Sequence, residues 1–140
     1  MIKDPSQLSR LQAEWAGVQR MRDRMKVLLA ATFAGGAFTA PALGGVVYSL
    51  PLLLAFDALG QVLTVLRDQG AFVCHSSQLG PSVDAAKPPV PWLDWQGVRD
   101  GVRRRNEVAH DGILHDAKSC NTDIEAIGNQ LVAWGVINAV

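Results

Sequence analysis

The stretch that decides the fold is Leu52–Leu66, with the sequence LLLAFDALGQVLTVL. At the helical angle of about 100° per residue, its apolar side chains cover most of the circumference of a helix. A helix of this kind has neighbours on several sides and lies at the centre of a bundle. Ser49 and Pro51 suit its start, and Gly70 suits its end. We therefore expect a central, buried helix between these residues.

A long amphipathic helix is expected before this central one. Asp4 can cap its amino end, and Pro5 suits the first turn. Apolar residues then recur at alternating spacings of three and four as far as about Phe33. The residues in this pattern are Leu8, Leu11, Trp15, Val18, Met25 and Leu29.

A third helix is expected from about Trp92 or Asp94 to about Asp111, with Gly112 placed to end it. The segment between the second and third helices, residues 71–91, contains Gly80-Pro81 and a Pro-rich run, and it is expected to form a long loop. Such loops are often functional or mobile.

The last helix is signalled by a capping box, in which Thr122 is followed three residues later by Glu125. The apolar face of this helix carries Ile124, Ile127, Leu131 and Trp134.

No segment of the sequence alternates apolar and polar residues as a strand does. The prediction is one domain, residues 1–140, folded as an all-α, up-and-down four-helix bundle that can include a fifth short helix.

The stretch Val27–Phe56 has no charged residue and is long enough to span a bilayer. However, several Gly and Pro residues interrupt it, and breaks facing lipid would leave backbone groups without hydrogen bonds. We therefore expect a Gly/Pro-rich connection at residues 34–51 between two buried helices, and no membrane span.

The formal net charge of the chain is zero, which excludes a nucleic-acid binder that relies on bulk positive charge. Basic residues are clustered nonetheless, at positions 20–26 and 99–105. Cys74 and Cys120 match neither a disulfide framework nor a zinc signature, so no metal and no cofactor is expected. The polar segment Met1–Leu8 lacks the features of a secretory signal, and a reducing cytoplasm is the expected compartment.

The third helix places one arginine where an apolar residue is expected. Its apolar stripe runs through Trp95, Val98, Val102 and Ala109, and Arg105 occupies the missing position of this stripe. Arginine there is costly unless it is paired or lines a cavity that holds an anion. Arg104 projects to roughly the opposite side, where it can be solvated.

Asn106 and His110 are four residues apart, so their side chains meet on the helix surface beside this stripe. His110 falls in the last turn, where the helix dipole favours its protonated form. Together with Arg105 they can hold a phosphate and move a proton without a metal ion.

Arg105-Asn106, three residues and then His110 resemble the signature of HEPN domains, which are helical bundles with an arginine, four to six residues and a histidine near the end of a late helix. Arg103 and Arg104 also satisfy this spacing, but Asn106 and the apolar stripe select Arg105. The specific part of the resemblance covers about Trp95 to Gly112.

The resemblance implies a homodimer whose paired motif helices form one composite cleft, and a metal-independent endoribonuclease that cuts RNA by attack of the ribose 2′-hydroxyl. Arg105 would bind the scissile phosphate, His110 would act as general base or acid, and Asn106 would orient His110 or the phosphate. The neighbouring Arg99, Arg103 and Arg104 would bind the RNA substrate. Such family members often act as toxins in toxin–antitoxin or antiviral systems, which implies an antitoxin protein as a further partner.

One departure concerns that antitoxin. Some family members carry a tyrosine two residues after the histidine that the antitoxin modifies, whereas this chain has Gly112 there and Tyr48 as its only tyrosine. Two other interpretations also remain open. Arg105 and His110 can serve in structural salt bridges, or the domain can be a non-catalytic helical dimer that binds a partner protein, a nucleotide or RNA.

Overall fold

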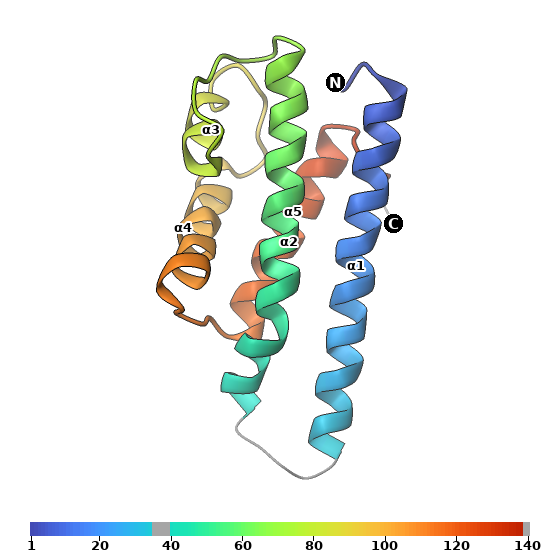
Figure 1. Cartoon of the computed structure of the whole chain (residues 1–140), viewed down its shortest axis with the longest axis vertical. Coiled ribbons are helices and arrows are strands. Elements are labelled where there is room, and N and C mark those ends of the chain that lie inside the picture. The colour runs from blue at the N-terminus through green and yellow to red at the C-terminus, as the bar shows by residue number, and fades with distance from the viewer. Residues whose placement is uncertain (35–39, 139–140) are drawn as a thin grey trace.

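The computed structural model describes residues 1–34 and 40–138, and the side chains of residues 1–30 and 45–138. These residues form five helices and no strand (Figure 1): α1 (Pro5–Ala34), α2 (Ala40–Asp68), α3 (Leu79–Ala85), α4 (Trp95–Asp111) and α5 (Ala117–Ala133). The predicted all-helical class is confirmed.

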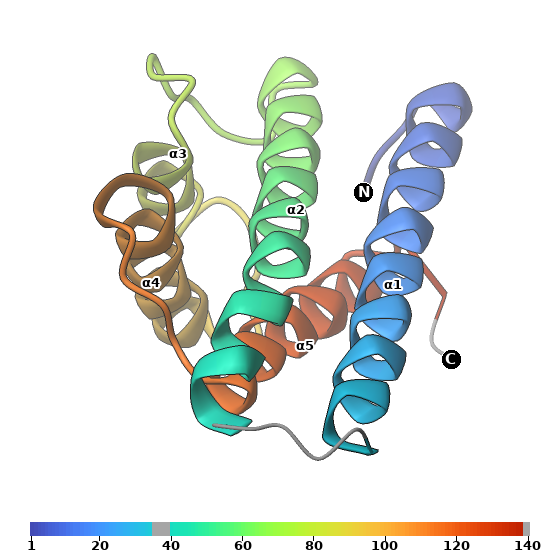
Figure 2. The same cartoon turned by 60° about the horizontal axis from the view of Figure 1, so that its bottom comes forward.

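The central position predicted for the second helix is also confirmed, because α2 contacts each of the other four helices. Helices α1 and α2 run antiparallel and side by side, and α5 crosses behind them (Figure 2). Helices α3 and α4 lie together on the opposite side of α2 from α1. The candidate residues of α4 are thus on the side of the molecule remote from α1.

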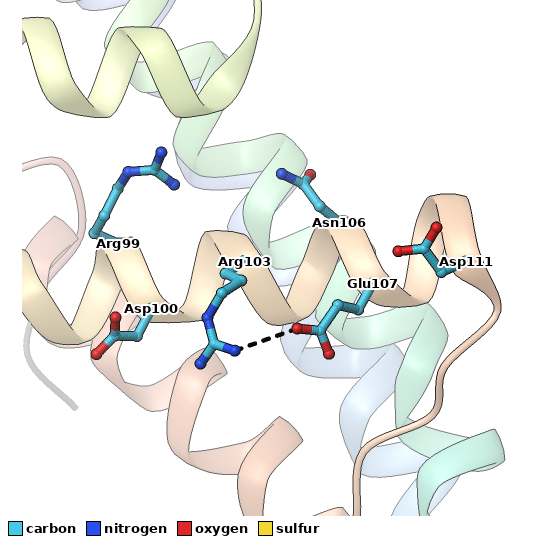
Figure 3. A pocket seen from close by; sticks show the side chains of 6 residues that line it. All are labelled: Arg99, Asp100, Arg103, Asn106, Glu107 and Asp111. Carbon is cyan, nitrogen blue, oxygen red and sulfur yellow. Dashed lines mark hydrogen bonds and ion pairs between the residues drawn. The ribbon is translucent and has the colours of Figure 1, made fainter.

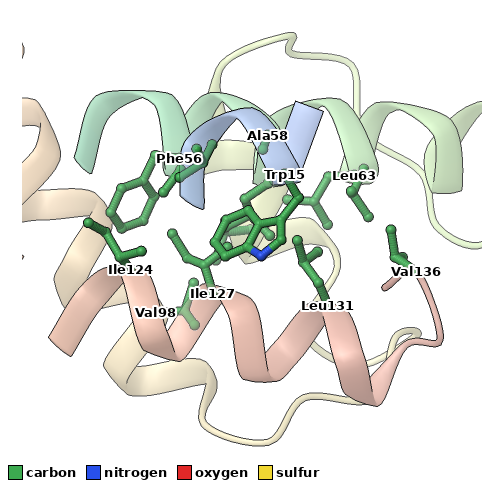
Figure 4. Packing of buried hydrophobic residues seen from close by; sticks show 14 of the residues in the cluster. Trp15, Phe56, Ala58, Leu63, Val98, Ile124, Ile127, Leu131 and Val136 are labelled. Carbon is green, nitrogen blue, oxygen red and sulfur yellow. The ribbon is translucent and has the colours of Figure 1, made fainter. Parts of the chain in front are cut away.

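The core forms where α1, α2, α4 and α5 meet around the apolar surface of α2 (Figure 4). Side chains of α2 such as Leu59 and Leu63 have no exposed surface at all. Trp15 of α1 lies over Gly128 of α5, where a β-carbon would be 3.0 Å from the indole Cζ2. Burial of this apolar surface is the main stabilising contribution to the fold. Other buried members of the cluster are Leu11, Val18, Leu52, Phe56, Val98, Val102, Ile124, Ile127 and Leu131.

The predicted Gly/Pro-rich connection is much shorter than expected, because α2 already begins at Ala40 and contains Pro51 in its interior. Residues 35–39 of that connection lie outside the described residues. Val47 and Tyr48 are buried, so packing against the core outweighs the poor helix propensity of this region. Gly45 has a packing role, since a β-carbon there would lie 2.5 Å from the carbonyl oxygen of His115.

Within the described residues, the segment Gly45–Asp68 of α2 is one helix that is long and apolar enough to cross a membrane. More than half of its most apolar window, 56%, is buried inside the fold. A core helix meets the same criteria of length and composition.

The expected helix caps at Asp4 and Gly112 are confirmed. The Asp4 carboxylate accepts a hydrogen bond from the backbone N–H of Ser6, at 2.9 Å. Helix α4 begins at the cap Asp94 and ends at Gly112, whose φ of 66° is the left-handed conformation that glycine adopts without strain.

The prediction of a capping box formed by Thr122 and Glu125 is wrong. Helix α5 begins earlier, with Asp116 as its cap, and the Asp116 carboxylate accepts a hydrogen bond from Ser119 N–H at 2.8 Å. Thr122 lies inside the helix, where its hydroxyl donates to the carbonyl of Lys118. Asp116 and Thr122 are both of residue types that cap helices, but only Asp116 lies at the position where the chain enters α5.

The predicted loop at residues 71–91 contains the short helix α3, which is the fifth helix that the sequence allowed. Two tryptophans attach this region to the bundle. Trp95 donates its indole N–H to the carbonyl of Val83 at 3.0 Å, and Trp92 donates to that of Ala86 at 3.2 Å. Trp92 also packs edge-on against Trp134, with ring centroids 4.8 Å apart. Helix α3 is therefore fixed beside α4.

Candidate functional site

The buried side of α4 is only partly the stripe that the sequence predicts. Val98 and Val102 are buried, together with Gly101, whose lack of a side chain lets α4 approach Phe56 of α2. Ala109 is exposed, so its predicted place in the apolar stripe is wrong. Two open pockets border α4 between Arg99 and Asp111.

Arg104 is not solvated, contrary to the expectation from the helix angle. Its Nε and Nη2 donate to the two carboxylate oxygens of Asp123 on α5, at 2.8 and 2.6 Å. Asp123 is only 4% exposed, and these hydrogen bonds raise the pKa of Arg104 above its usual value. The pairing satisfies a buried carboxylate and gives Arg104 a structural role.

Arg105, in contrast, has no carboxylate partner among the described residues. Its Nη1 donates to Asn106 Oδ1 at 3.0 Å, and its buried Nε has no hydrogen-bond partner. Neither Arg105 nor His110 forms an ion pair in the described part of the chain. The interpretation of these two residues as structural salt-bridge partners is therefore wrong. The Nη groups of a half-buried guanidinium that is not engaged by a carboxylate can bind an anion.

The three predicted catalytic residues line one pocket of about 510 Å³. Arg105, Asn106 and His110 come to it from α4, together with Arg99 one and a half turns earlier. The other wall is formed by α2, by the segment that leads into α3 and by the first turn of α3. The residues on that wall are Phe56, Asp57, Ser77, Gln78, Leu79, Gly80 and Pro81.

A second pocket of about 450 Å³ lies beside the first along α4 (Figure 3). Arg99 and Asn106 border both pockets and point to the same side of the helix, whereas Arg103 and Glu107 pair with each other on another side, at 3.3 Å. Arg99 is held by Asp84 of α3, with 2.8 Å between its Nε and the carboxylate. Of the three arginines predicted to bind substrate, Arg99 and Arg103 thus border the pockets, whereas Arg104 is engaged by Asp123.

Asp57 is the pocket residue that the sequence analysis missed. It is exposed, and its Oδ2 accepts a hydrogen bond from Gln61 at 2.9 Å. A signal was available, because Asp57 is the only charged residue between Lys26 and Arg67. One carboxylate in so long an uncharged stretch has to face solvent, a partner or a cavity.

The two cysteines offer little chemistry. Cys120 is buried, and this burial raises the pKa of its thiol to about 11, so the reactive thiolate is scarce at neutral pH. Cys74 is half-buried and unpaired with another cysteine. Among the described residues there is no group of three or more His, Cys, Asp or Glu side chains placed to hold a metal ion.

The pocket combines one unpaired guanidinium, an amide that orients it, an exposed imidazole and a carboxylate. These groups can bind a phosphate and exchange protons with it. A scan of protein-family models finds no match for this chain, and searches of curated proteins and of solved structures find none either.

Proposed function

We propose that this chain is a metal-independent endoribonuclease of the HEPN type. The observation that supports this most directly is that Arg105, Asn106 and His110 line one pocket while Arg105 lacks any carboxylate partner. A phosphodiester offers the anionic oxygens that the unused guanidinium N–H groups can bind. The pocket is also open to a polymer, since His110 at its edge is exposed.

In this proposal, Arg105 binds the scissile phosphate and stabilises the charge that develops on its oxygens in the transition state. Asn106 orients the guanidinium rather than the imidazole, because its Oδ1 accepts from Arg105 Nη1. His110 exchanges a proton with the reacting oxygens. Arg99, held at the pocket edge by Asp84, would contact a neighbouring phosphate.

We also propose that the active form is a homodimer in the cytoplasm, with a toxin-like role. Ile113 and Leu114 directly follow the motif helix and are about half exposed, at 49% and 48%. The start of α2 adjoins them and contributes the exposed Val46 and Leu50. A second copy that covers these side chains would remove apolar surface from water and bring two motif helices together.

The test is cleavage of single-stranded RNA in EDTA by the full chain. Arg105→Ala and His110→Ala should each reduce the rate at least a hundred-fold, as expected for loss of transition-state charge stabilisation or proton transfer. The helical circular-dichroism spectrum should stay unchanged. Arg24→Ala, which removes an exposed arginine of α1 that has no ion pair among the described residues, is the matched control and should cut normally. Normal cleavage by both site variants would overturn the assignment.

The second candidate is a non-catalytic helical dimer that binds a partner protein, a nucleotide or RNA. The exposed apolar residues Val46, Leu50, Ile113 and Leu114 favour it, because a stable interface needs such surface whether or not the pocket is catalytic. The two candidates differ in one result. A non-catalytic dimer would leave the RNA uncut in the same assay and would still bind its partner.

A further inference from the structure

The central helix α2 carries two carboxylates, Asp57 and Asp68, and Asp57 lies in the same pocket as the motif residues. Asp57 lines the pocket together with Arg105, Asn106 and His110. The neighbouring residues Phe56, Ala58 and Leu59 are buried in the core, so α2 is rigidly fixed at this position. A group on such an element is held in place more precisely than one on a loop.

The orientation of the Asp57 carboxylate is set by a chain of hydrogen bonds that begins on α1. Glu14 pairs with Arg10 at 3.1 Å, and Arg10 Nη1 donates to Gln61 Oε1 at 2.6 Å. This contact fixes which end of the Gln61 amide is oxygen, so its nitrogen must donate to Asp57 Oδ2. No described residue donates to the other oxygen, Oδ1. Asp57 therefore keeps an acceptor for a substrate hydroxyl.

Cleavage by a ribose 2′-hydroxyl requires two proton transfers. A base must take the proton of the attacking 2′-oxygen, and an acid must protonate the leaving 5′-oxygen. Four titratable side chains line the pocket, but the guanidinium groups of Arg99 and Arg105 stay protonated. Asp57 and His110 are therefore the two groups of this pocket that can exchange protons at ordinary pH.

We propose that Asp57 is the general base of the reaction and that His110 is the general acid, so that one chain supplies both proton-transfer groups. The inference rests on the proposed ribonuclease function and deepens it. The Asp57 carboxylate takes the proton of the 2′-hydroxyl, and the 2′-oxygen bonds to phosphorus. The bond from phosphorus to the 5′-oxygen breaks, and protonated His110 gives its proton to that oxygen. The products are a 2′,3′-cyclic phosphate and a 5′-hydroxyl, and water restores both side chains.

Several charged groups lie around this pair. Arg10 and Glu14 of α1 act on Asp57 through Gln61, and they form an ion pair with each other. From α4, Arg105 contributes a full positive charge, whereas Arg99 is balanced by Asp84 of α3. Asp57 and His110 themselves are exposed, so water screens all these interactions.

The test is the pH dependence of cleavage of an end-labelled, mixed-sequence oligoribonucleotide in EDTA. For the wild type we expect a bell-shaped profile, because the reaction needs a base that has lost its proton and an acid that has kept it. Asp57→Asn keeps the shape of the side chain and its acceptor for Gln61. It should lower kcat about a hundred-fold, leave KM within a factor of three, and abolish the acid limb while the alkaline limb remains.

Asp68→Asn is the control, because Asp68 is an exposed carboxylate of the same helix that does not line the pocket. It should reproduce the wild-type profile. If Asp57→Asn keeps the wild-type rate and both limbs, the base is another group and the inference is wrong. That result leaves the ribonuclease function intact, whereas an inactive wild type, or an Arg105→Ala variant with full activity, would refute the proposed function itself.

Discussion

Arg104 and Arg105 are neighbours in the sequence, yet the fold uses them in different ways. Arg104 is bound through two hydrogen bonds by the buried Asp123, while Arg105 is held only by the amide of Asn106 and faces the pocket. A carboxylate that is bound on both oxygens keeps its guanidinium partner away from any substrate. The adjacent arginines are therefore expected to respond differently to substitution.

Arg104→Ala should reduce the free energy of unfolding by about 3 kcal/mol or more, since it leaves the Asp123 carboxylate buried without its partner. Arg103→Ala should lower the free energy of unfolding by only about 0.5 kcal/mol, because the Arg103 side chain in its ion pair with Glu107 is largely exposed to water. Urea unfolding followed by circular dichroism measures both. Equal, small losses for the two variants would contradict a structural role for Arg104.

For residues of a single helix, the sequence predicts which side chains lie close together. The spacing of Arg105, Asn106 and His110 placed them together, and the structure brings them to one pocket. The partners Asp57 and Asp123 were not predicted, because they come from other helices. Their distance to α4 depends on tertiary packing, which no local periodicity encodes.

At the level of the elements, glycines determine how closely α4 approaches its neighbours. A β-carbon at Gly101 would lie 2.8 Å from Phe56 Cζ and 3.1 Å from Asp123 Oδ1. Both of these side chains are buried, so they have little room to move. The same two helices carry Asp57 and His110, which line the pocket.

Gly101→Ala should therefore destabilise the protein by about 1–3 kcal/mol through overpacking, although alanine is the better helix former. Gly17→Ala in α1 is the matched control. Its β-carbon would meet only the end of the Arg20 side chain at 3.7 Å, and the change should stabilise by about 0.5–1 kcal/mol. Thermal unfolding of the two variants compares them, and a stabilised Gly101→Ala variant would refute this packing argument.

The helix ends show where local sequence signals suffice. Asp94 and Gly112 bound α4 as predicted, because a cap and a left-handed glycine act within a few residues. The start of α2 was predicted too late, since Pro51 suits a first turn yet lies here inside a buried helix. Packing of Val47 and Tyr48 against the core decides the outcome there.

In the whole molecule, α2 links the core to the candidate site (Figure 1). Its contacts with α1 and α5 are part of the core, and the side that faces α3 and α4 bounds the pocket. The start of α2 contacts the loop after α4, and both carry exposed apolar residues. A homodimer that covers them would close the site from outside, which is why we expect cleavage to depend on protein concentration.

The ends of the RNA fragments that the wild-type protein forms in EDTA test the proposed ribonuclease activity most directly. Attack by the ribose 2′-hydroxyl leaves a 2′,3′-cyclic phosphate and a 5′-hydroxyl, which mass spectrometry identifies. We predict these ends for RNA and no cleavage of the matching DNA, which lacks the nucleophile. Fragments with 5′-phosphate ends, or RNA that remains intact, would contradict the account.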